Sequence, residues 1–507
     1  MPRAHLIAVF ATLLPVSAAI NDPVRLENGL ISGLSGSNPD VRVFKGVPFA
    51  VPPVGDLRWR APKMAAAWDG VRKADRFSAT CMQTPYPEGS LYRGAPQPVS
   101  EDCLYLNVWT AAKSSKERRP VMVWIHGGAF TRGSGSTPTY DGEELANKGV
   151  VLVSINYRLG VFGFFAHPEL TKESDRNASG NYGILDQIAA LEWVQKNIAA
   201  FGGDPKRVTI FGESAGSWAV NCLMATPLAK GLFQRVIGES GAQFGPMRKL
   251  TDAEEAGVKL AQTLGADSIA ALRAKPAEEL LKASGPASPT VDGWLFPENI
   301  YAIFAKGKQN DVPLLIGSNA DEGTAFAPPS VKADSFRQTA QTRFGAQADA
   351  FLKLYPATSD EEAKASQNAS FRDQAFGWQM RTWARMQTKT GKSKVYLYYF
   401  SRVPPGPESA RYGAYHASEI SYVFHNLDKS TRPWEDTDRK LSDAMSSYWV
   451  NFASTGDPNG KGLPKWPAYQ QKTDVAMGLG DKIAPLATPH KAALDFLDEY
   501  FAKQRGQ

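Results

Sequence analysis

Continuous apolar runs along the chain are typical of buried strands. Two such runs occupy residues 120–125 and 150–155, and both are rich in β-branched residues without alternating polar positions. Strands of this kind are covered on both faces, as in a parallel or mixed central sheet. Similar runs follow at residues 207–211, 312–317 and 395–400. The pattern therefore predicts several strands of one buried sheet.

Helical periodicity fills the intervals between these runs. Apolar residues recur at helical spacing before a Gly-Gly-Asp-Pro stop at residues 202–205; they are Ile184, Leu185, Ile188, Leu191, Val194 and Ile198. Residues 214–226 have the pattern of a second helix, which Pro227 ends. Helix-like segments at 252–284 and 331–390 are predicted to be insertions that cap the sheet. Alternating strands and helices predict an α/β fold with a mostly parallel central sheet, flanked by helices and carrying large helical insertions.

The N-terminus has the three regions of a signal peptide. Arg3 supplies a positive charge, residues 6–14 form an apolar run too short to span a bilayer, and small residues at 16–19 offer a cleavage site. We expect a signal peptide at residues 1–19, a single domain at 20–507, and a secreted or periplasmic protein. The alternative is a buried or disordered N-terminus.

Composition narrows the class of protein. The 507 residues are 43% hydrophobic and 21% charged, as in a soluble globular protein, and no run of eighteen apolar residues occurs. The formal net charge of +6 is spread along the chain, with its densest basic cluster only at residues 113–119. This distribution favours a solvated surface over a nucleic-acid interface. We therefore expect no membrane span and no nucleic-acid partner.

A GxSxG segment, Gly212-Glu213-Ser214-Ala215-Gly216, lies between a predicted strand and a predicted helix. A nucleophilic serine at such a sharp turn projects its hydroxyl clear of the backbone, and the flanking glycines leave room for the turn. Gly238-Glu239-Ser240-Gly241-Ala242 is similar but ends in alanine. The first segment therefore makes Ser214 the candidate nucleophile.

A glycine-rich turn, His126-Gly127-Gly128-Ala129-Phe130, follows the predicted strand at 120–125. Ester hydrolysis forms a tetrahedral oxyanion, which backbone N–H groups bind where side chains leave room. This turn, together with the N–H of Ala215 after the serine, is a candidate oxyanion hole. The alternative is an ordinary glycine turn.

Chain order limits the candidates for the catalytic base and acid. In the order nucleophile, acid, base, the histidine follows Ser214, which leaves His416, His425 and His490. Asp321 and Glu322 follow the strand-like run at 312–317, and either carboxylate could orient an imidazole. We expect a histidine in a loop, such as His416, to be favoured over one in packed or terminal sequence.

With these residues in place, the chain resembles the type B carboxylesterases, the family that also contains cholinesterases. The likeness extends from residues 44–50 to 455–459, and its most specific segments are residues 101–108 and 211–216. The resemblance implies the α/β-hydrolase fold, with Ser214 as nucleophile, Glu322 as acid and His416 as base. It also implies an oxyanion hole formed by the N–H groups of Gly128, Ala129 and Ala215, with Gly127 serving the turn.

Cysteine content sets this chain apart from the animal members of the family. Of the three cysteines, Cys81 and Cys103 lie in turn-rich sequence and match the family's first disulfide, whereas Cys222 lies in an apolar helical stretch. The other disulfides of the animal enzymes are absent, so the chain is more similar to microbial esterases. Choline-ester specificity is therefore not implied.

The resemblance implies a hydrolase that acts on a small-molecule ester through an acyl-serine intermediate, without a metal or organic cofactor. A lipase is one alternative, but it requires a large exposed apolar lid that the insertions do not indicate. A peptidase or amidase is another. A third is a non-enzymatic protein, as in relatives that keep the fold but have lost the serine, but here every catalytic position implied by the resemblance is filled. Phe130, Trp218 and Phe326 are candidate walls of the substrate pocket, although a place in the core is the favoured interpretation of each.

Overall fold

The computed structural model describes residues 20–283, 285 and 287–506. The predicted signal peptide at residues 1–19 lies outside the described residues. The main sheet has eleven strands in the order β18-β17-β16-β15-β12-β11-β9-β10-β8-β4-β3. Their bounds are β3 (Leu34–Ser35), β4 (Arg42–Pro48), β8 (Tyr105–Thr110), β9 (Arg119–Ile125), β10 (Val151–Ile155), β11 (Gly203–Glu213), β12 (Arg235–Glu239), β15 (Leu314–Asn319), β16 (Val395–Phe400), β17 (Val475–Leu479) and β18 (Ile483–Ala487).

Short strands form small separate sheets beside this one. They are β1 (Val24–Leu26), β2 (Gly29–Ser32), β5 (Val71–Lys73), β6 (Thr80–Cys81), β7 (Val99–Ser100), β13 (Arg248–Lys249) and β14 (Thr290–Val291). The helices are α1 (Glu143–Asn147), α2 (Gly160–Phe164), α3 (Pro168–Glu173), α4 (Tyr182–Asn197), α5 (Ala215–Ala225), α6 (Leu250–Thr263), α7 (Ile269–Ala274), α8 (Ala277–Lys282), α9 (Ile300–Ala305), α10 (Ala333–Phe344), α11 (Ala348–Leu354), α12 (Asp360–Arg372), α13 (Trp378–Thr390), α14 (Ser409–Tyr412), α15 (Ile420–Val423), α16 (Asp436–Thr455) and α17 (Lys491–Gln504). Two short helical turns matter below: the 3₁₀ turn η5 (Glu322–Phe326) and the π-helical turn η7 (Asp373–Gly377).

The middle of the main sheet is parallel, and its two ends are antiparallel. Strands β10, β9, β11, β12, β15, β16 and β17 pair in parallel, whereas β8, β4 and β3 at one end and β18 at the other pair antiparallel. The prediction of a mostly parallel sheet flanked by helices is confirmed. The carboxyl ends of the parallel strands meet at one edge, where ligands bind in open α/β sheets.

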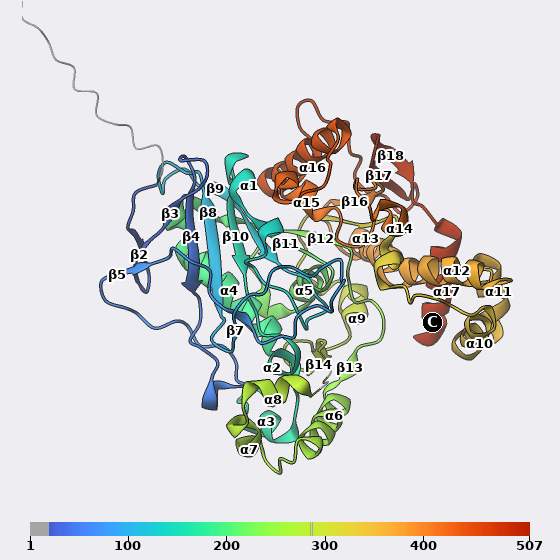
Figure 1. Cartoon of the computed structure of the whole chain (residues 1–507), viewed down its shortest axis with the longest axis horizontal. Helices are drawn as coiled ribbons and strands as arrows, with labels where there is room; N and C mark the ends of the chain where they lie inside the picture. The colour runs from blue at the N-terminus through green and yellow to red at the C-terminus, as the bar shows by residue number, and fades with distance from the viewer. Residues whose placement is uncertain (1–19, 284, 286, 507) are drawn as a thin grey trace, which may run out of the picture.

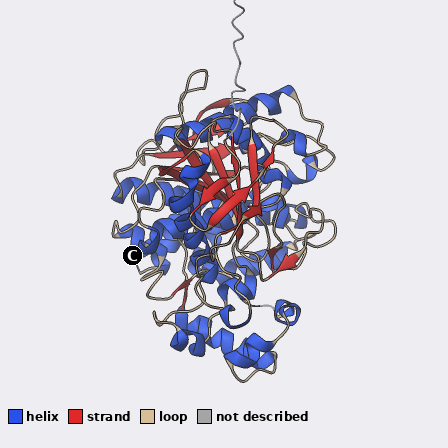
Figure 2. Cartoon of the chain, turned by 90° about the vertical axis from the view of Figure 1, so that its left-hand side faces the viewer, coloured by secondary structure: helices blue, strands red, loops and turns tan. Residues whose placement is uncertain are grey.

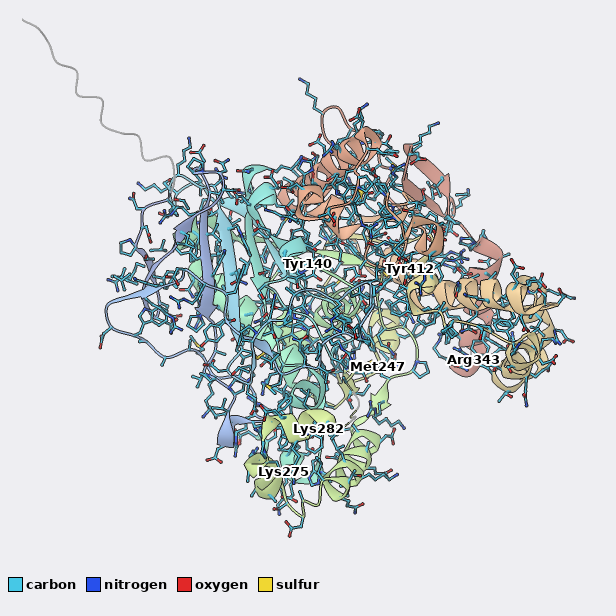
Figure 3. The ribbon with its side chains drawn as sticks, viewed as in Figure 1. Tyr140, Met247, Lys275, Lys282, Arg343 and Tyr412 are labelled. Atoms are coloured by element: carbon cyan, nitrogen blue, oxygen red, sulfur yellow. A yellow bond between two sulfur atoms is a disulfide. The ribbon has the colours of Figure 1, made fainter. Side chains whose placement is uncertain are left out.

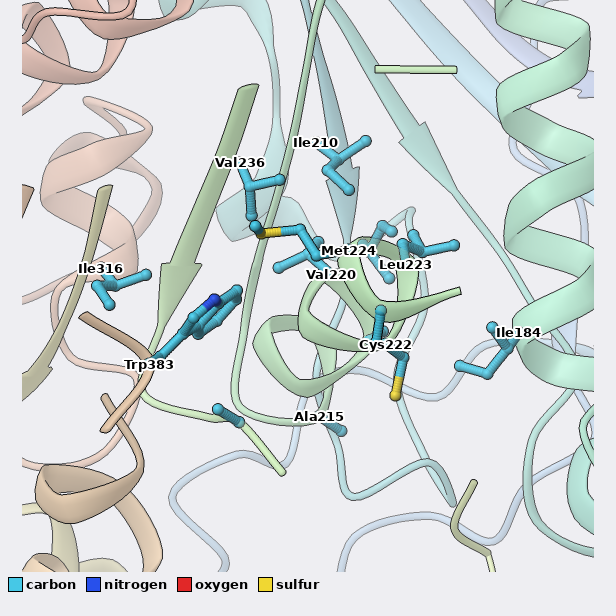
Figure 4. Close-up of a cluster of buried hydrophobic side chains, with 14 of the residues drawn as sticks. Ile184, Ile210, Ala215, Val220, Cys222, Leu223, Met224, Val236, Ile316 and Trp383 are labelled. Carbon is cyan, nitrogen blue, oxygen red and sulfur yellow. The ribbon is translucent and has the colours of Figure 1, made fainter. Parts of the chain in front are cut away.

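Apolar cores on both faces of the sheet explain the continuous apolar runs. In β9, Val121, Val123 and Ile125 belong to one core cluster, whereas Met122 and Trp124 belong to another. Figure 2 shows the sheet between layers of helices. Helix α5 packs on one of these faces, and its Val220 and Met224 lie against Ile210 of β11 and Val236 of β12 (Figure 4).

The predicted helices and insertions are present with small shifts in their bounds. The helix expected at 184–198 is α4, and the one expected at 214–226 is α5. The segment at 252–284 contains α6, α7 and α8, and the segment at 331–390 contains α10 to α13. In Figure 1 these two insertions lie on different sides of the sheet, α6–α8 at the bottom and α10–α12 at the right beside α17. Across the described residues, no helix combines the length and apolar character needed to cross a membrane.

Candidate active site

Ser214 lies on a strained turn between β11 and α5. Its backbone has φ 58° and ψ −122°, a conformation that non-glycine residues rarely adopt. A Cβ at Gly216 would collide with the carbonyl oxygen of Ile125, and one at Gly212 would meet the same oxygen. The flanking glycines therefore let β11 and α5 approach β9 closely enough to hold the turn. The Ser214 side chain is partly accessible to solvent.

Ser240 occupies a similar turn at the end of β12 but is enclosed. Its φ is 55°, and its side chain is fully buried. Its backbone N–H donates to the carbonyl of Gly317. A substrate carbonyl can reach Ser214 but not Ser240, in agreement with the preference for the first GxSxG segment.

The glycine turn after β9 packs directly against the serine. A Cβ at Gly127 would lie 3.0 Å from the Cβ of Ser214. Gly128 (φ 105°) and Ala129 (φ 55°) both have left-handed backbone conformations. Over the described ranges, the N–H groups of Gly128 and Ala129 make no hydrogen bond within the chain. Together with the N–H of Ala215 at the start of α5, they are available to an oxyanion.

His126, the first residue of this turn, packs against Tyr157 and contacts the backbone of the turn. Its ring is stacked on Tyr157 with centroids 4.5 Å apart, and Nδ1 lies 2.8 Å from the carbonyl oxygen of Gly127. The Tyr157 hydroxyl donates to the carbonyl of His126. Burial lowers the pKa of His126 to about 4. This histidine is therefore a neutral structural residue at neutral pH.

His416 and Glu322 are brought together from two loops. His416 Nδ1 lies 2.5 Å from Glu322 Oε2, and both side chains are buried. The other oxygen of Glu322 accepts from the backbone N–H of Asn319 at the end of β15. A carboxylate held in this way fixes the tautomer of the imidazole and leaves Nε2 as its basic nitrogen.

Asp321 has a different partner from its neighbour. Its Oδ2 accepts from the backbone N–H of Ala414 at 2.8 Å, and its own N–H donates to the carbonyl of Ala414. Asp321 therefore fixes the segment that leads to His416, whereas Glu322 contacts the ring. The other two candidate histidines bond elsewhere: His425 Nδ1 lies 2.8 Å from the Ser442 hydroxyl, and His490 Nε2 lies 3.1 Å from the Tyr399 hydroxyl.

Glu213, which precedes the serine, lies where these groups meet. Its Oε1 is 3.1 Å from His416 Nε2, without hydrogen-bond geometry. Its Oε2 is 3.0 Å from the position of a Cβ at Gly127. Within the part of the chain that the structure describes, Ser214 makes no hydrogen bond to His416. Nucleophile–base bonds often tighten only when substrate is bound.

Three buried glutamates, Glu213, Glu239 and Glu419, lie in and next to the candidate site, and sequence reasoning gave them no role. Burial, together with the charges of Glu419, Glu322 and Glu239, raises the pKa of Glu213 well above its ordinary value. Burial likewise raises the pKa of Glu419 strongly and that of Glu239 to about 8. For Glu239 the available signal was a carboxyl group directly after the short run Val236-Ile237-Gly238.

Aromatic rings surround the catalytic histidine candidate. The ring centroid of Phe376 is 4.5 Å from that of His416, and that of Phe326 is 5.0 Å away. Of the three predicted wall residues, Phe326 is exposed beside the histidine, Trp218 is half-buried, and Phe130 is fully buried in the core. Phe376 and the Tyr92 hydroxyl, which donates to the His416 carbonyl, were not foreseen. Across the described residues, no group of His, Cys, Asp and Glu side chains is arranged to hold a metal ion.

Comparison with known proteins identifies the family of this chain. The Carboxylesterase family model matches residues 21–496. The chain belongs to the carboxylesterase family. It is 40% identical over 499 residues to the fumonisin B1 esterase of Sphingopyxis macrogoltabida, a match that covers 93% of this chain and 89% of that protein. It is 37% identical over 490 residues to the para-nitrobenzyl esterase of Bacillus subtilis (strain 168), covering 91% and 95%.

A solved structure agrees with the sequence comparisons. A PNB esterase superposes with a TM-score of 0.83 at 35% identity, covering 94% of this chain and 99% of that one. The resemblance to type B carboxylesterases is thereby confirmed, and this carboxylesterase is a carboxylic-ester hydrolase. The disulfide between Cys81 and Cys103 is present, and Cys222 is a buried free thiol. That disulfide is consistent with an oxidising compartment.

Proposed function

We propose that this carboxylesterase cleaves small-molecule esters with Ser214 as nucleophile, His416 as general base and acid, and Glu322 as the group that orients the histidine. The single observation that carries the proposal is the pairing of His416 Nδ1 with the buried carboxylate of Glu322, while its Nε2 lies 3.1 Å from Glu213, the residue before the strained serine. These are the roles of a serine-hydrolase triad.

The first half of the reaction forms the acyl-enzyme. His416 Nε2 removes the proton of the Ser214 hydroxyl as the oxygen attacks the ester carbonyl carbon. The resulting oxyanion accepts hydrogen bonds from the N–H groups of Gly128, Ala129 and Ala215. The tetrahedral intermediate then collapses, and the alcohol leaves with the proton from His416. Glu322 stabilises the imidazolium throughout.

Hydrolysis of the acyl-serine follows the same steps, with water as the nucleophile in place of Ser214. His416 activates the water, the oxyanion forms in the same turn, and Ser214 leaves with the returned proton. Glu213, whose raised pKa favours the neutral acid, does not compete for this proton as a charged group.

Export is proposed on two independent features. The N-terminal sequence pattern predicts cleavage before Ala19 or Ile20, and the disulfide is stable in an oxidising compartment. N-terminal sequencing of protein recovered outside the cytoplasm is expected to begin at one of these residues. An intact Met1 in that protein would contradict the proposal.

The test of function compares Ser214→Ala with the matched variant Ser240→Ala. Turnover of p-nitrophenyl acetate is expected to fall by about 10⁴-fold or more in the first, since the covalent route is lost, and to persist in the second. An organophosphate is expected to label Ser214 alone. Near-normal turnover by Ser214→Ala would overturn the triad, and faster turnover of amides or emulsified triglycerides than of soluble esters would favour an amidase or a lipase.

A further inference from the structure

A cavity of about 340 Å³ lies beside the candidate active site, among α10, α12, η7, α17 and the loop after β12. Its wall contains five phenylalanine rings: Phe336, Phe344, Phe351, Phe371 and Phe501. This volume is within the range of small-molecule sites, and an apolar wall of this kind favours an apolar occupant. Neither Ser214 nor His416 lines the cavity, so its relation to the triad depends on what lies between them.

An exposed aromatic surface connects the catalytic histidine to this cavity. Phe326 is 46% exposed, a high value for a large apolar side chain. Its ring centroid is 5.0 Å from that of His416 and 5.2 Å from that of Phe371, which lines the cavity. A chain attached to the reacting carbonyl can therefore lie along Phe326 and remain in contact with apolar surface until it enters the cavity.

The π-helical turn η7 forms a wall that is shared by the two sites. Phe376 of this turn contacts His416, whereas Gln374 and Ala375 line the cavity. π-helical turns inside α-helices occur frequently at functional sites. Here the wider turn is continuous with α12 and α13 and presents residues to both the histidine and the cavity.

The opposite wall is connected to the nucleophile. A Cβ at Gly241 would collide with the carbonyl oxygen of Ser214, and the same loop continues to Gln243 and Gly245, which line the cavity. Gln379 also lines the cavity and accepts from the backbone N–H of Phe244, which fixes this loop to α13. The cavity is therefore held in a fixed position relative to both Ser214 and His416.

The polar groups of the lining are uncharged, apart from Arg343. Arg343 lies on an exposed stretch of α10 and is labelled in Figure 3. Gln374 Oε1 is buried without a hydrogen-bond partner among the described residues, although its Nε2 donates to the Ser370 carbonyl. A lining of five phenyl rings with neutral amide and hydroxyl side chains suits an uncharged, largely apolar chain better than an ionic one.

We propose that this cavity binds the apolar chain of a long-chain ester, an inference that rests on the proposed function of Ser214 and His416. The chain extends from the reacting carbonyl along Phe326 and ends among the five phenylalanines. An acyl chain and an alcohol chain share this chemistry, and the two arms of the experiment distinguish them.

The experiment uses two threonines of α10 as a matched pair. Thr339 lines the cavity and Thr342 does not; both are exposed, and each hydroxyl donates to the carbonyl four residues earlier. Thr339→Trp fills part of the cavity, whereas Thr342→Trp places the same bulk outside it. Both variants are compared with the unmodified protein on two substrate series, p-nitrophenyl esters from acetate to decanoate and acetate esters from ethyl to decyl.

For Thr339→Trp we expect kcat/KM to fall at least about tenfold for the long members of one series, as when two buried methylenes are lost, and to stay within about twofold for the short members. Loss in the first series assigns the cavity to the acyl chain, and loss in the second assigns it to the alcohol chain. Thr342→Trp should behave like the unmodified protein on every ester.

Three outcomes would overturn the inference. They are an equal loss at all chain lengths, an equal loss in Thr342→Trp, and an unmodified protein whose kcat/KM does not rise with chain length in either series. These outcomes differ from failure of the proposed function, in which p-nitrophenyl acetate itself is not hydrolysed or Ser214 is not labelled. Circular dichroism of both variants checks that the fold is retained.

Discussion

Asp321 and Glu322 are adjacent in the sequence, but their carboxylates have different partners. Glu322 contacts the His416 ring, whereas Asp321 accepts from the backbone of Ala414. Removing charge from Glu322 leaves a group that can hold the wrong tautomer of the imidazole. Removing charge from Asp321 leaves an amide oxygen that can still accept from the same backbone N–H.

We therefore predict that Glu322→Gln lowers kcat about 10⁴-fold, as when a triad carboxylate becomes an amide. Asp321→Asn should lower kcat much less and act mainly on the stability of the His416 segment. The two variants are compared at saturating substrate after circular dichroism has shown that both are folded. An inactive Asp321→Asn beside a normal Glu322→Gln would reverse the assignment of the acid and leave the serine and histidine in place.

Local sequence signals pointed to one candidate nucleophile and one candidate base, but they did not choose between the two neighbouring carboxylates. The GxSxG segment and the position of the histidine in a loop led to Ser214 and His416, because chain order and turn chemistry are local properties. The choice between Asp321 and Glu322 came from family resemblance, since the direction of a side chain depends on partners distant in sequence. The backbone N–H of Asn319 binds the Glu322 carboxylate, and that of Ala414 binds the Asp321 carboxylate. Nothing in the local sequence around Asn319 or Ala414 indicates these contacts.

At the scale of elements, apolar runs revealed β9, β10, β11, β15 and β16 but not β12. That strand contains Gly238 and ends at Glu239, so its run is short and interrupted. Missing β12 also meant missing the buried glutamate at its end. The π-helical turn η7 had no local signal either, because its sequence is that of an ordinary helix; its contact with His416 through Phe376 joins residues distant in sequence.

The end of β12 makes stability depend on pH. Burial raises the pKa of Glu239 to about 8, although the indole N–H of Trp449 donates to its Oε1 at 2.8 Å. The unfolded chain releases this proton near its ordinary, acidic pKa, so unfolding releases a proton between that value and about pH 8. The stabilisation is therefore complete in acid and is lost as the pH rises through this window.

We predict that Glu239→Gln reduces this loss, because glutamine keeps the acceptor for Trp449 and has no proton to release. The Tm of the unmodified protein should fall between pH 5 and pH 9, and the fall should be smaller in the variant. It will not vanish, since burial also raises the pKa of Glu213 and Glu419. Glu361→Gln, at an exposed position of α12, is the control and should leave the profile unchanged. Parallel profiles for Glu239→Gln and the unmodified protein would contradict the proton assignment.

At the scale of the whole molecule, the disulfide closes a loop that touches both halves of the site. Cys81 and Cys103 are 22 residues apart. Within this loop, Gln83 exchanges two hydrogen bonds with the backbone of Gly133, which follows the glycine turn at 126–130. The Tyr92 hydroxyl donates to the carbonyl of His416. The loop closed by the disulfide therefore contacts both the segment after the glycine turn and the segment of His416.

We predict that the double variant Cys81→Ala/Cys103→Ala loses both stability and turnover. Closing a loop of this length contributes about 3 kcal/mol to the free energy of unfolding, because the bond restricts the unfolded chain. In addition, a looser Gln83 and Tyr92 would let the glycine turn and His416 drift, and catalysis is sensitive to small displacements of its groups. We expect kcat on p-nitrophenyl acetate to fall at least about tenfold, with a smaller change in KM.

Urea unfolding measures the loss of stability, and steady-state kinetics measure the loss of turnover. Cys222→Ala, which removes only the buried free thiol, is the control for loss of a cysteine. A double variant with reduced stability but unchanged kcat would show that the loop holds the fold together without positioning the site.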